Sequence, residues 1–161
     1  MDISSLPRLN LPPCELPLRV AADGEAQIFD PLRGRWLRLT PEEHVRQAFA
    51  AWMRDGLGYP AGLTATEVGL RLNGTIKRSD IVVFDRSRHP LVIVECKAPS
   101  VAITRAVFDQ IVRYNMALRA RLLIVTNGLR HYAVAVDYAS RSTRFLPAIP
   151  HFSTLTDTPT Q

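Results

Sequence analysis

The chain has 161 residues, of which 47% are hydrophobic, and this suits one globular domain with a core of its own. Its 20 lysines and arginines outnumber its 15 acidic residues, and the formal charge of +5 weakly favours a polyanionic partner. The longest apolar runs are strand-sized and the N-terminus lacks a basic start, so we expect neither a membrane span nor a signal peptide. Cys14 and Cys96 lie in unlike contexts, which favours a reduced, cytoplasmic protein.

The first 39 residues predict peripheral structure. Residues 1–22 are rich in proline and lack periodicity, which is typical of an extended arm that lies on the domain or stays mobile. Two short runs, 26–29 and 35–39, flank a turn and predict a small hairpin. We therefore assign residues 1–39 to an N-terminal arm and a small hairpin.

A helix is predicted over 41–55. Thr40 can cap it, a proline occupies its first position, and Glu43 completes a capping box three residues after the cap. Gly56 is the expected end of the helix. Arg46 and Gln47 on this helix face either a phosphate or water.

The remaining elements alternate between strand and helix patterns. Turn residues separate the apolar runs, and only one further run has helical spacing. The predicted strands are 64–72, 81–84, 91–97, 122–126 and 131–136, and the predicted helix is 104–119. The order is therefore αβββαββ over residues 40–137, and the polar residues 138–161 predict a loosely packed C-terminal tail.

Three charged side chains mark the ends of the hairpin formed by 81–84 and 91–97. If the turn is centred near residues 87 and 88, Asp80 lies across from Glu95 on the neighbouring strand. Side chains alternate along a strand, so Glu95 and Lys97 share one face and Cys96 points to the other. Opposed carboxylates repel one another unless a cation lies between them, and their hard oxygens suit Mg²⁺ or Mn²⁺.

Each of these residues also has a structural interpretation. Asp80 can be a solvated carboxylate at a strand end, and Lys97 can extend from the strand end to solvent. Glu95 follows four apolar residues, so its structural alternative is a buried salt bridge to Lys97 or Arg78.

Asp80 followed by the Glu95-Cys96-Lys97 triplet resembles the core of the PD-(D/E)XK nuclease superfamily. The helix at 104–119 carries Gln110 and Tyr114, which match the Q-x-x-x-Y element of several of its branches. The segments 77–83, 94–99 and 126–128 are similar to the N-terminal domain of type I restriction enzyme R subunits, including stand-alone versions, and the similarity extends over residues 40–136. Ser79 stands where the superfamily pattern usually has proline.

The resemblance implies a fold, an activity and a set of site residues. The fold is an α/β restriction-endonuclease-like core with a mixed central sheet flanked by helices. The activity is Mg²⁺- or Mn²⁺-dependent hydrolysis of DNA phosphodiester bonds. The implied catalytic residues are Asp80, Glu95, Lys97, Gln110, Tyr114 and Glu43. Asp80, Glu95 and the Cys96 carbonyl would hold the metal, and the further carboxylate of the site is either Glu43, which the capping box also explains, or Glu67.

Two rival functions share this fold. One is a non-catalytic DNA-binding or assembly module of a restriction or repair complex, and the other is an RNA-directed nuclease. DNA is the expected partner and RNA the alternative, with a homodimer or partner subunits of a complex also expected. The predicted helix and the residues just after it carry four arginines that form either a basic rim of the site or an ordinary solvated helix face: Arg105, Arg113, Arg119 and Arg121. The four histidines show no metal-binding spacing, which argues against zinc and histidine-metal nuclease classes.

Overall fold

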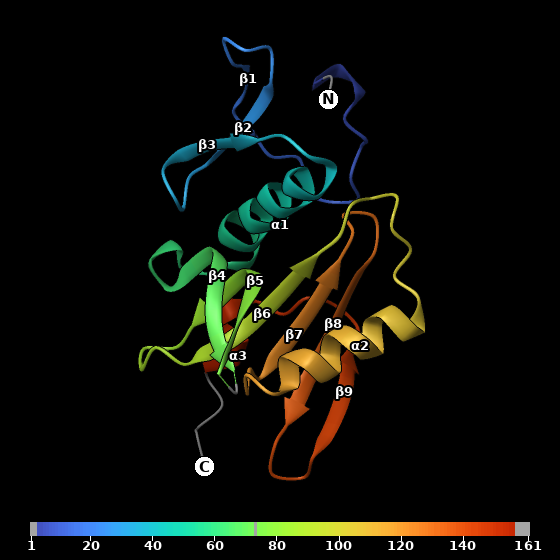
Figure 1. Cartoon of the computed structure of the whole chain (residues 1–161). Coiled ribbons are helices and arrows are strands. Elements are labelled where there is room, and N and C mark those ends of the chain that lie inside the picture. The colour runs from blue at the N-terminus through green and yellow to red at the C-terminus, as the bar shows by residue number, and fades with distance from the viewer. Residues whose placement is uncertain (1–2, 73, 157–161) are drawn as a thin grey trace.

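The computed structural model describes residues 3–72 and 74–156, and its strands form two sheets (Figure 1). The small sheet contains β1 (Leu18–Val20), β2 (Ala26–Asp30) and β3 (Arg35–Arg38). The large sheet contains β4 (Thr64–Leu72), β5 (Thr75–Phe84), β6 (Pro90–Cys96), β7 (Leu122–Thr126), β8 (His131–Asp137) and β9 (Ser142–Leu146). The helices are α1 (Pro41–Leu57), α2 (Arg105–Met116) and α3 (Phe152–Thr156), with short 3₁₀ turns at Ile3–Ser5 and Ala61–Leu63.

The large sheet is mixed, as expected. Its strands follow chain order from β4 to β9, and β6 and β7 are parallel while every other neighbouring pair is antiparallel. The parallel pair requires a crossover, and α2 supplies it. The α/β class and the restriction-endonuclease-like arrangement are confirmed.

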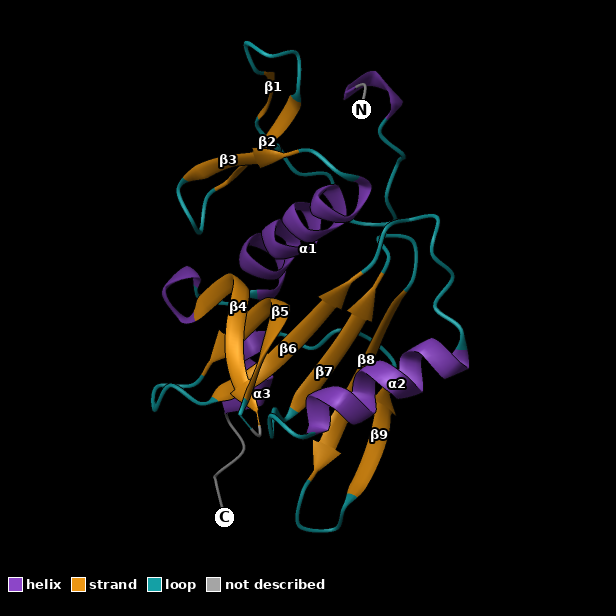
Figure 2. Cartoon of the chain, in the orientation of Figure 1, coloured by secondary structure: helices purple, strands orange, loops and turns teal. Residues whose placement is uncertain are grey.

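The two main helices cover the large sheet from opposite sides. Residues of α1 pack with the β6 and β7 side chains Val92, Val94 and Ile124, whereas residues of α2 pack with Ile93 and Leu123, which alternate with them. On its other side α1 meets the small sheet, so that the helix lies between two sheets (Figure 2). Within the described residues, no helix is long and apolar enough to cross a membrane.

The start of α1 is the predicted one, and its end differs. The Thr40 hydroxyl accepts a hydrogen bond from the Glu43 amide at 3.0 Å. The helix continues to Leu57 and ends at Gly58, whose φ of 73° is left-handed. The predicted end at Gly56 is therefore wrong, because Gly58 has the backbone geometry of a C-cap and Gly56 remains helical.

Segments toward both ends of the described chain pack on the core. The Asn10 amide donates to the Gly128 carbonyl at 2.8 Å, so the N-terminal arm is fixed to the turn between β7 and β8. We expected a loosely packed tail after residue 137, but β9 extends the large sheet, and Ile149 and Phe152 join the core beneath α1. Alternation is hard to detect in β9 because four of its five residues are exposed.

Candidate active site

The sheet forks at the predicted hairpin. The antiparallel pairing of β5 with β6 includes Ile81 opposite Val94, and β5 then continues beside β4 while β6 continues beside β7. Asp80 and Glu95 are the next residues along these two strands, so the register puts them across from one another at the fork.

Asp80 contacts the triplet directly. Its Oδ2 accepts a hydrogen bond from the Cys96 amide at 2.6 Å, and its side chain is 13% exposed. The Cys96 side chain is buried in the core beneath α1, whereas the Glu95 carboxylate lies 3.5 Å from the Asn115 amide of α2. Glu95 and Cys96 therefore point to opposite faces, as their alternation predicted. The sharing of a metal ion by Asp80 and Glu95 remains a prediction.

A buried arginine occupies the acidic side of the fork. The Arg46 guanidinium lies 2.8 Å from Asp80, 3.0 Å from Glu67 and 3.6 Å from Glu42, and it also pairs with Glu43. Sequence analysis placed Arg46 against a phosphate or water, but only 5% of this residue is exposed. In the structure its charge is compensated by carboxylates of α1, β4 and β5.

Glu43 does more than complete a cap. Its backbone amide donates to Thr40, and its carboxylate points toward the interior, where it accepts hydrogen bonds from Arg46 and from Gln47, the latter at 2.9 Å. Arg33 of the turn between β2 and β3 lies 4.0 Å from the same carboxylate. Glu43 thus belongs to the group of carboxylates around Arg46, called here the acidic cluster, which consists of Glu42, Glu43, Glu67 and Asp80.

Glu67 lies opposite Asp80 on β4 with unusual backbone geometry. Its φ is 53°, a left-handed value in a residue with a β-carbon, and the β4–β5 ladder skips it between the pairs Thr66–Ile81 and Val68–Ser79. The carboxylate contacts Arg46 and, at 3.1 Å, Arg78. Such strain persists where neighbouring contacts maintain it, and it clusters at functional sites. Arg78 pairs here with Glu67, whereas the sequence offered it to Glu95.

The electrostatics show how closely the charges gather. Burial raises the pKa of the Cys96 thiol well above its usual value, and Asp80 and Glu95 raise it further while Arg46 opposes them. The pKa of Glu42 is also raised, first by burial and then by Asp80, although Lys97 and Arg46 lower it. The ionisation of Glu42 therefore depends on the charges of Asp80, Lys97 and Arg46 as well as on burial.

The predicted residues of α2 are less tied to the site. Gln110 is exposed, and the side chain of Tyr114 falls outside the described part of the structure. The α2 residue seen near the triplet is Asn115, which is 1% exposed and donates to the Ile111 carbonyl at 3.0 Å. The arginines offered as a basic rim (Arg105, Arg113, Arg119 and Arg121) are all exposed, and Arg105 pairs with Asp109.

The donors at the fork fit a hard cation in kind. Among residues 3–72 and 74–156, no three His, Cys, Asp or Glu side chains are grouped as metal ligands. The chemistry of these donors matches Mg²⁺ or Mn²⁺. The guanidinium of Arg46 shows that a positive charge is already favourable beside Asp80.

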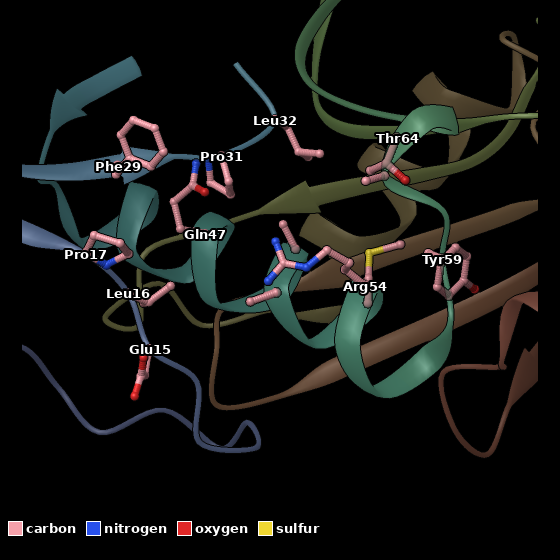
Figure 3. A pocket seen from close by; sticks show the side chains of 14 residues that line it. Glu15, Leu16, Pro17, Phe29, Pro31, Leu32, Gln47, Arg54, Tyr59 and Thr64 are labelled. Carbon is pink, nitrogen blue, oxygen red and sulfur yellow. The ribbon is translucent and has the colours of Figure 1, made fainter. Parts of the chain in front are cut away.

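A pocket lies on the far side of α1 from the fork. Residues of the arm, the small sheet, α1 and the segment that follows α1 line it, among them Glu15, Phe29, Arg54 and Tyr59 (Figure 3). Gln47 lines this pocket and also donates to Glu43, so it separates the pocket from the acidic cluster. None of the residues predicted above as catalytic or metal-binding lines this pocket.

Sequence reasoning missed Asn115, the central position of Arg46, and the link to the small sheet. Asp30 of β2 is fully buried and accepts hydrogen bonds from Arg33 at 2.7 Å and from the Thr66 hydroxyl at 2.8 Å. The position of Arg46 three residues after Glu43, on the helix face of the predicted site, was the available signal.

Comparisons with known proteins bear on the family and the fold of the chain. Residues 41–150 match the family described as type I restriction enzyme R protein N terminus. A solved fragment assigned as an HsdR subunit of a type I restriction enzyme from Vibrio vulnificus YJ016 has a TM-score of 0.51 and 18% identity, over 73% of this chain and 25% of that one. No curated protein matches.

The chain therefore spans about a quarter of its structural neighbour, and at this identity the likeness concerns the fold alone. The family match extends over residues 41–150 and includes α1, the fork, α2 and β7 to β9. From this match we conclude that the chain belongs to the family of type I restriction enzyme R protein N-terminal domains.

Proposed function

We propose that the chain is a divalent-metal-dependent nuclease domain of the PD-(D/E)XK type that hydrolyses DNA phosphodiester bonds in restriction, defence or repair. The observation that carries the proposal is the contact between Asp80 and the triplet. The acid on β5 accepts a hydrogen bond from the amide between Glu95 and Lys97, at the point where the two strands part. Family membership supports the same conclusion.

The residues would divide the chemistry in a simple way. Asp80, Glu95 and the Cys96 carbonyl would hold Mg²⁺ or Mn²⁺, which lowers the pKa of water and neutralises phosphate charge when bound. Lys97 would align the attacking water and stabilise negative charge on the phosphate. Glu43 and Glu67 would act indirectly, by binding Arg46, which contacts Asp80. Gln110 and Tyr114 would help to position Lys97 or the phosphate.

The surroundings of such a domain follow from the family. We propose DNA as the substrate and further subunits of a restriction or repair complex as partners, with the remainder of an R protein as the most direct candidate. The two cysteines, Cys14 and Cys96, are both free, which supports a reducing compartment such as the cytoplasm.

One observation favours a second candidate, a non-catalytic DNA-binding or assembly module. Arg46 is bonded to Asp80, and a permanent ion pair at that position would keep a metal out. In that case the fork would hold the fold together, and DNA contacts would come from exposed arginines.

A cleavage assay separates these functions. Supercoiled plasmid, linear duplex, single-stranded DNA and RNA are each incubated with the protein and Mg²⁺ or Mn²⁺, beside Lys97→Ala and Asp80→Asn. We expect DNA cleavage that requires metal and is lost in both variants. Binding of DNA without cleavage under all metal conditions would support the module instead, and preferential cleavage of RNA would reassign the substrate.

A further inference from the structure

Arg46 is unusual because one cation serves several carboxylates in a buried place. Its guanidinium contacts Asp80 through the same Nη2 nitrogen that lies 3.0 Å from Glu67, while Nη1 pairs with Glu43. Its Nε is buried and has no hydrogen-bond partner. The guanidinium is therefore turned toward the carboxylates while its Nε–H makes no hydrogen bond. Burying that donor without a partner is unfavourable, and the contacts of Nη1 and Nη2 with the carboxylates offset it.

Arg46 has carboxylate partners besides Asp80. If Asp80 were withdrawn, Glu43 and Glu67 would still compensate the arginine charge. Asp80 in turn has both oxygens engaged, Oδ1 by Arg46 and Oδ2 by the Cys96 amide. A metal ion that binds Asp80 would share an oxygen that already accepts a hydrogen bond, and a guanidinium 2.8 Å from the carboxylate would repel that ion.

Resting on the proposed function, we propose that Arg46 is a built-in counter-cation that holds Asp80 until a divalent ion arrives and then remains on Glu43 and Glu67. Arg46 is thus a positioning residue that sets the affinity of the site for metal. The strained backbone of Glu67 has a role in this exchange, because it keeps a second carboxylate facing Arg46 after Asp80 is released.

The test compares metal affinities in the absence of nucleic acid. Mn²⁺ binding is measured by calorimetry, and melting temperature is measured with and without Mn²⁺, for the parent protein, Arg46→Gln and Arg78→Gln. Arg78 is the matched control because it carries the same charge and contacts Glu67, but it is 72% exposed at the side chain. We expect Arg46→Gln to bind Mn²⁺ about tenfold more tightly than the parent, the scale of one charge-assisted hydrogen bond, and Arg78→Gln to change the affinity by less than about threefold.

Two results would overturn the proposal and can be told apart. Parent protein that neither binds Mn²⁺ nor is stabilised by it would refute both the metal site and the role of Arg46. Parent protein that binds Mn²⁺ while Arg46→Gln binds no more tightly than Arg78→Gln would refute the role of Arg46 alone.

If Arg46→Gln does not fold, the parent protein decides the question. The Nε–H resonance of Arg46 is followed by NMR during titration with Mg²⁺, which is diamagnetic. We expect this resonance to move with the same midpoint as Mg²⁺ binding measured by calorimetry. A resonance that stays in place while the site fills would show that Arg46 does not leave Asp80.

Discussion

Two substitutions of Asp80 should differ in their effect on stability, because its two oxygens have different partners. Asp80→Ala removes the acceptor of the Cys96 amide and one acceptor of Arg46. Asp80→Asn keeps an amide oxygen that can accept from Cys96, but it loses the charge that faces Arg46. Neither variant retains a metal ligand of normal strength, so both should lose divalent-ion binding.

The magnitude follows from what each variant leaves without a partner. Cys96 is fully buried, so an amide there cannot turn to water, and an unsatisfied buried donor costs about 1–3 kcal/mol. Arg46 keeps its contacts with Glu43 and Glu67 in both variants, so we expect the loss of the Arg46–Asp80 contact to contribute only about 1 kcal/mol. Asp80→Ala should therefore lower the free energy of unfolding by about 2–4 kcal/mol and Asp80→Asn by about 1–2 kcal/mol.

Urea unfolding followed by circular dichroism measures the difference, with metal chelated throughout. Each kcal/mol corresponds to about 2–4 °C in melting temperature for a chain of this size, so thermal melts give a second reading. Equal losses for alanine and asparagine would refute the hydrogen bond from Cys96. An unchanged Asp80→Ala protein would refute both contacts of Asp80.

Three further predictions concern the scaffold around the site. Gly128→Ala should lower the free energy of unfolding in urea by about 2–4 kcal/mol, because φ is +80° and a new Cβ would meet Leu9 at 2.7 Å. Gly24→Ala, which has a similar φ but open space around the new Cβ, should lower it by about 1 kcal/mol. Equal losses for the two variants would contradict the contact between Gly128 and Leu9. Thr40→Ala should cost about 1 kcal/mol in the same assay while Thr40→Ser costs less, and a neutral alanine would show that the cap is not made. Burial lowers the pKa of His131 below its usual 6.5, although the hydrogen bond to the Asn10 carbonyl opposes this, so the unfolded chain takes up the proton first as the pH falls. The stability contributed by this group should therefore be constant above pH 6.5 and decrease as the pH drops below 6.5. Thermal melts at a series of pH values measure this dependence, and His131→Gln should remove it.

The sequence predicts the fork well because its signals are local. Apolar runs with a polar turn between them define β5 and β6, and counting from the turn puts Asp80 across from Glu95 without any knowledge of the rest of the fold. The observed register, with Ile81 opposite Val94, agrees with that count. The two strands part where the apolar runs end.

The partners of the fork residues are not local, and there sequence reasoning was incomplete. Arg46 and Asp80 are 34 positions apart, so their ion pair depends on how α1 lies across β5. Alternation along the strand would also have turned Asp80 toward α2, but its carboxylate contacts Arg46 of α1, as does the carboxylate of Glu67, whose φ is 53°. A left-handed glutamate carries no pattern that marks it in advance.

The periphery was hardest to predict for a different reason. Strand β9 is mostly exposed and takes its conformation from β8, so its residues need no apolar alternation. The buried network of Asp30 similarly depends on contact between the small sheet and β4, through Thr66. Neither feature is encoded in a window of neighbouring residues.

The attachment of the N-terminal arm has a consequence for the order in which the chain acquires its structure. The backbone carbonyl of Asn10 accepts a hydrogen bond from the ring of His131, 121 positions later in the chain, and the backbone amide of Asn10 donates to the Gly128 carbonyl. A ribosome makes the arm before its binding partners, so the arm cannot dock until β7, β8 and the turn between them have left the exit tunnel. During synthesis the surface of α1 that Leu9 and Leu11 cover is therefore open, and it closes only when the large sheet is nearly complete.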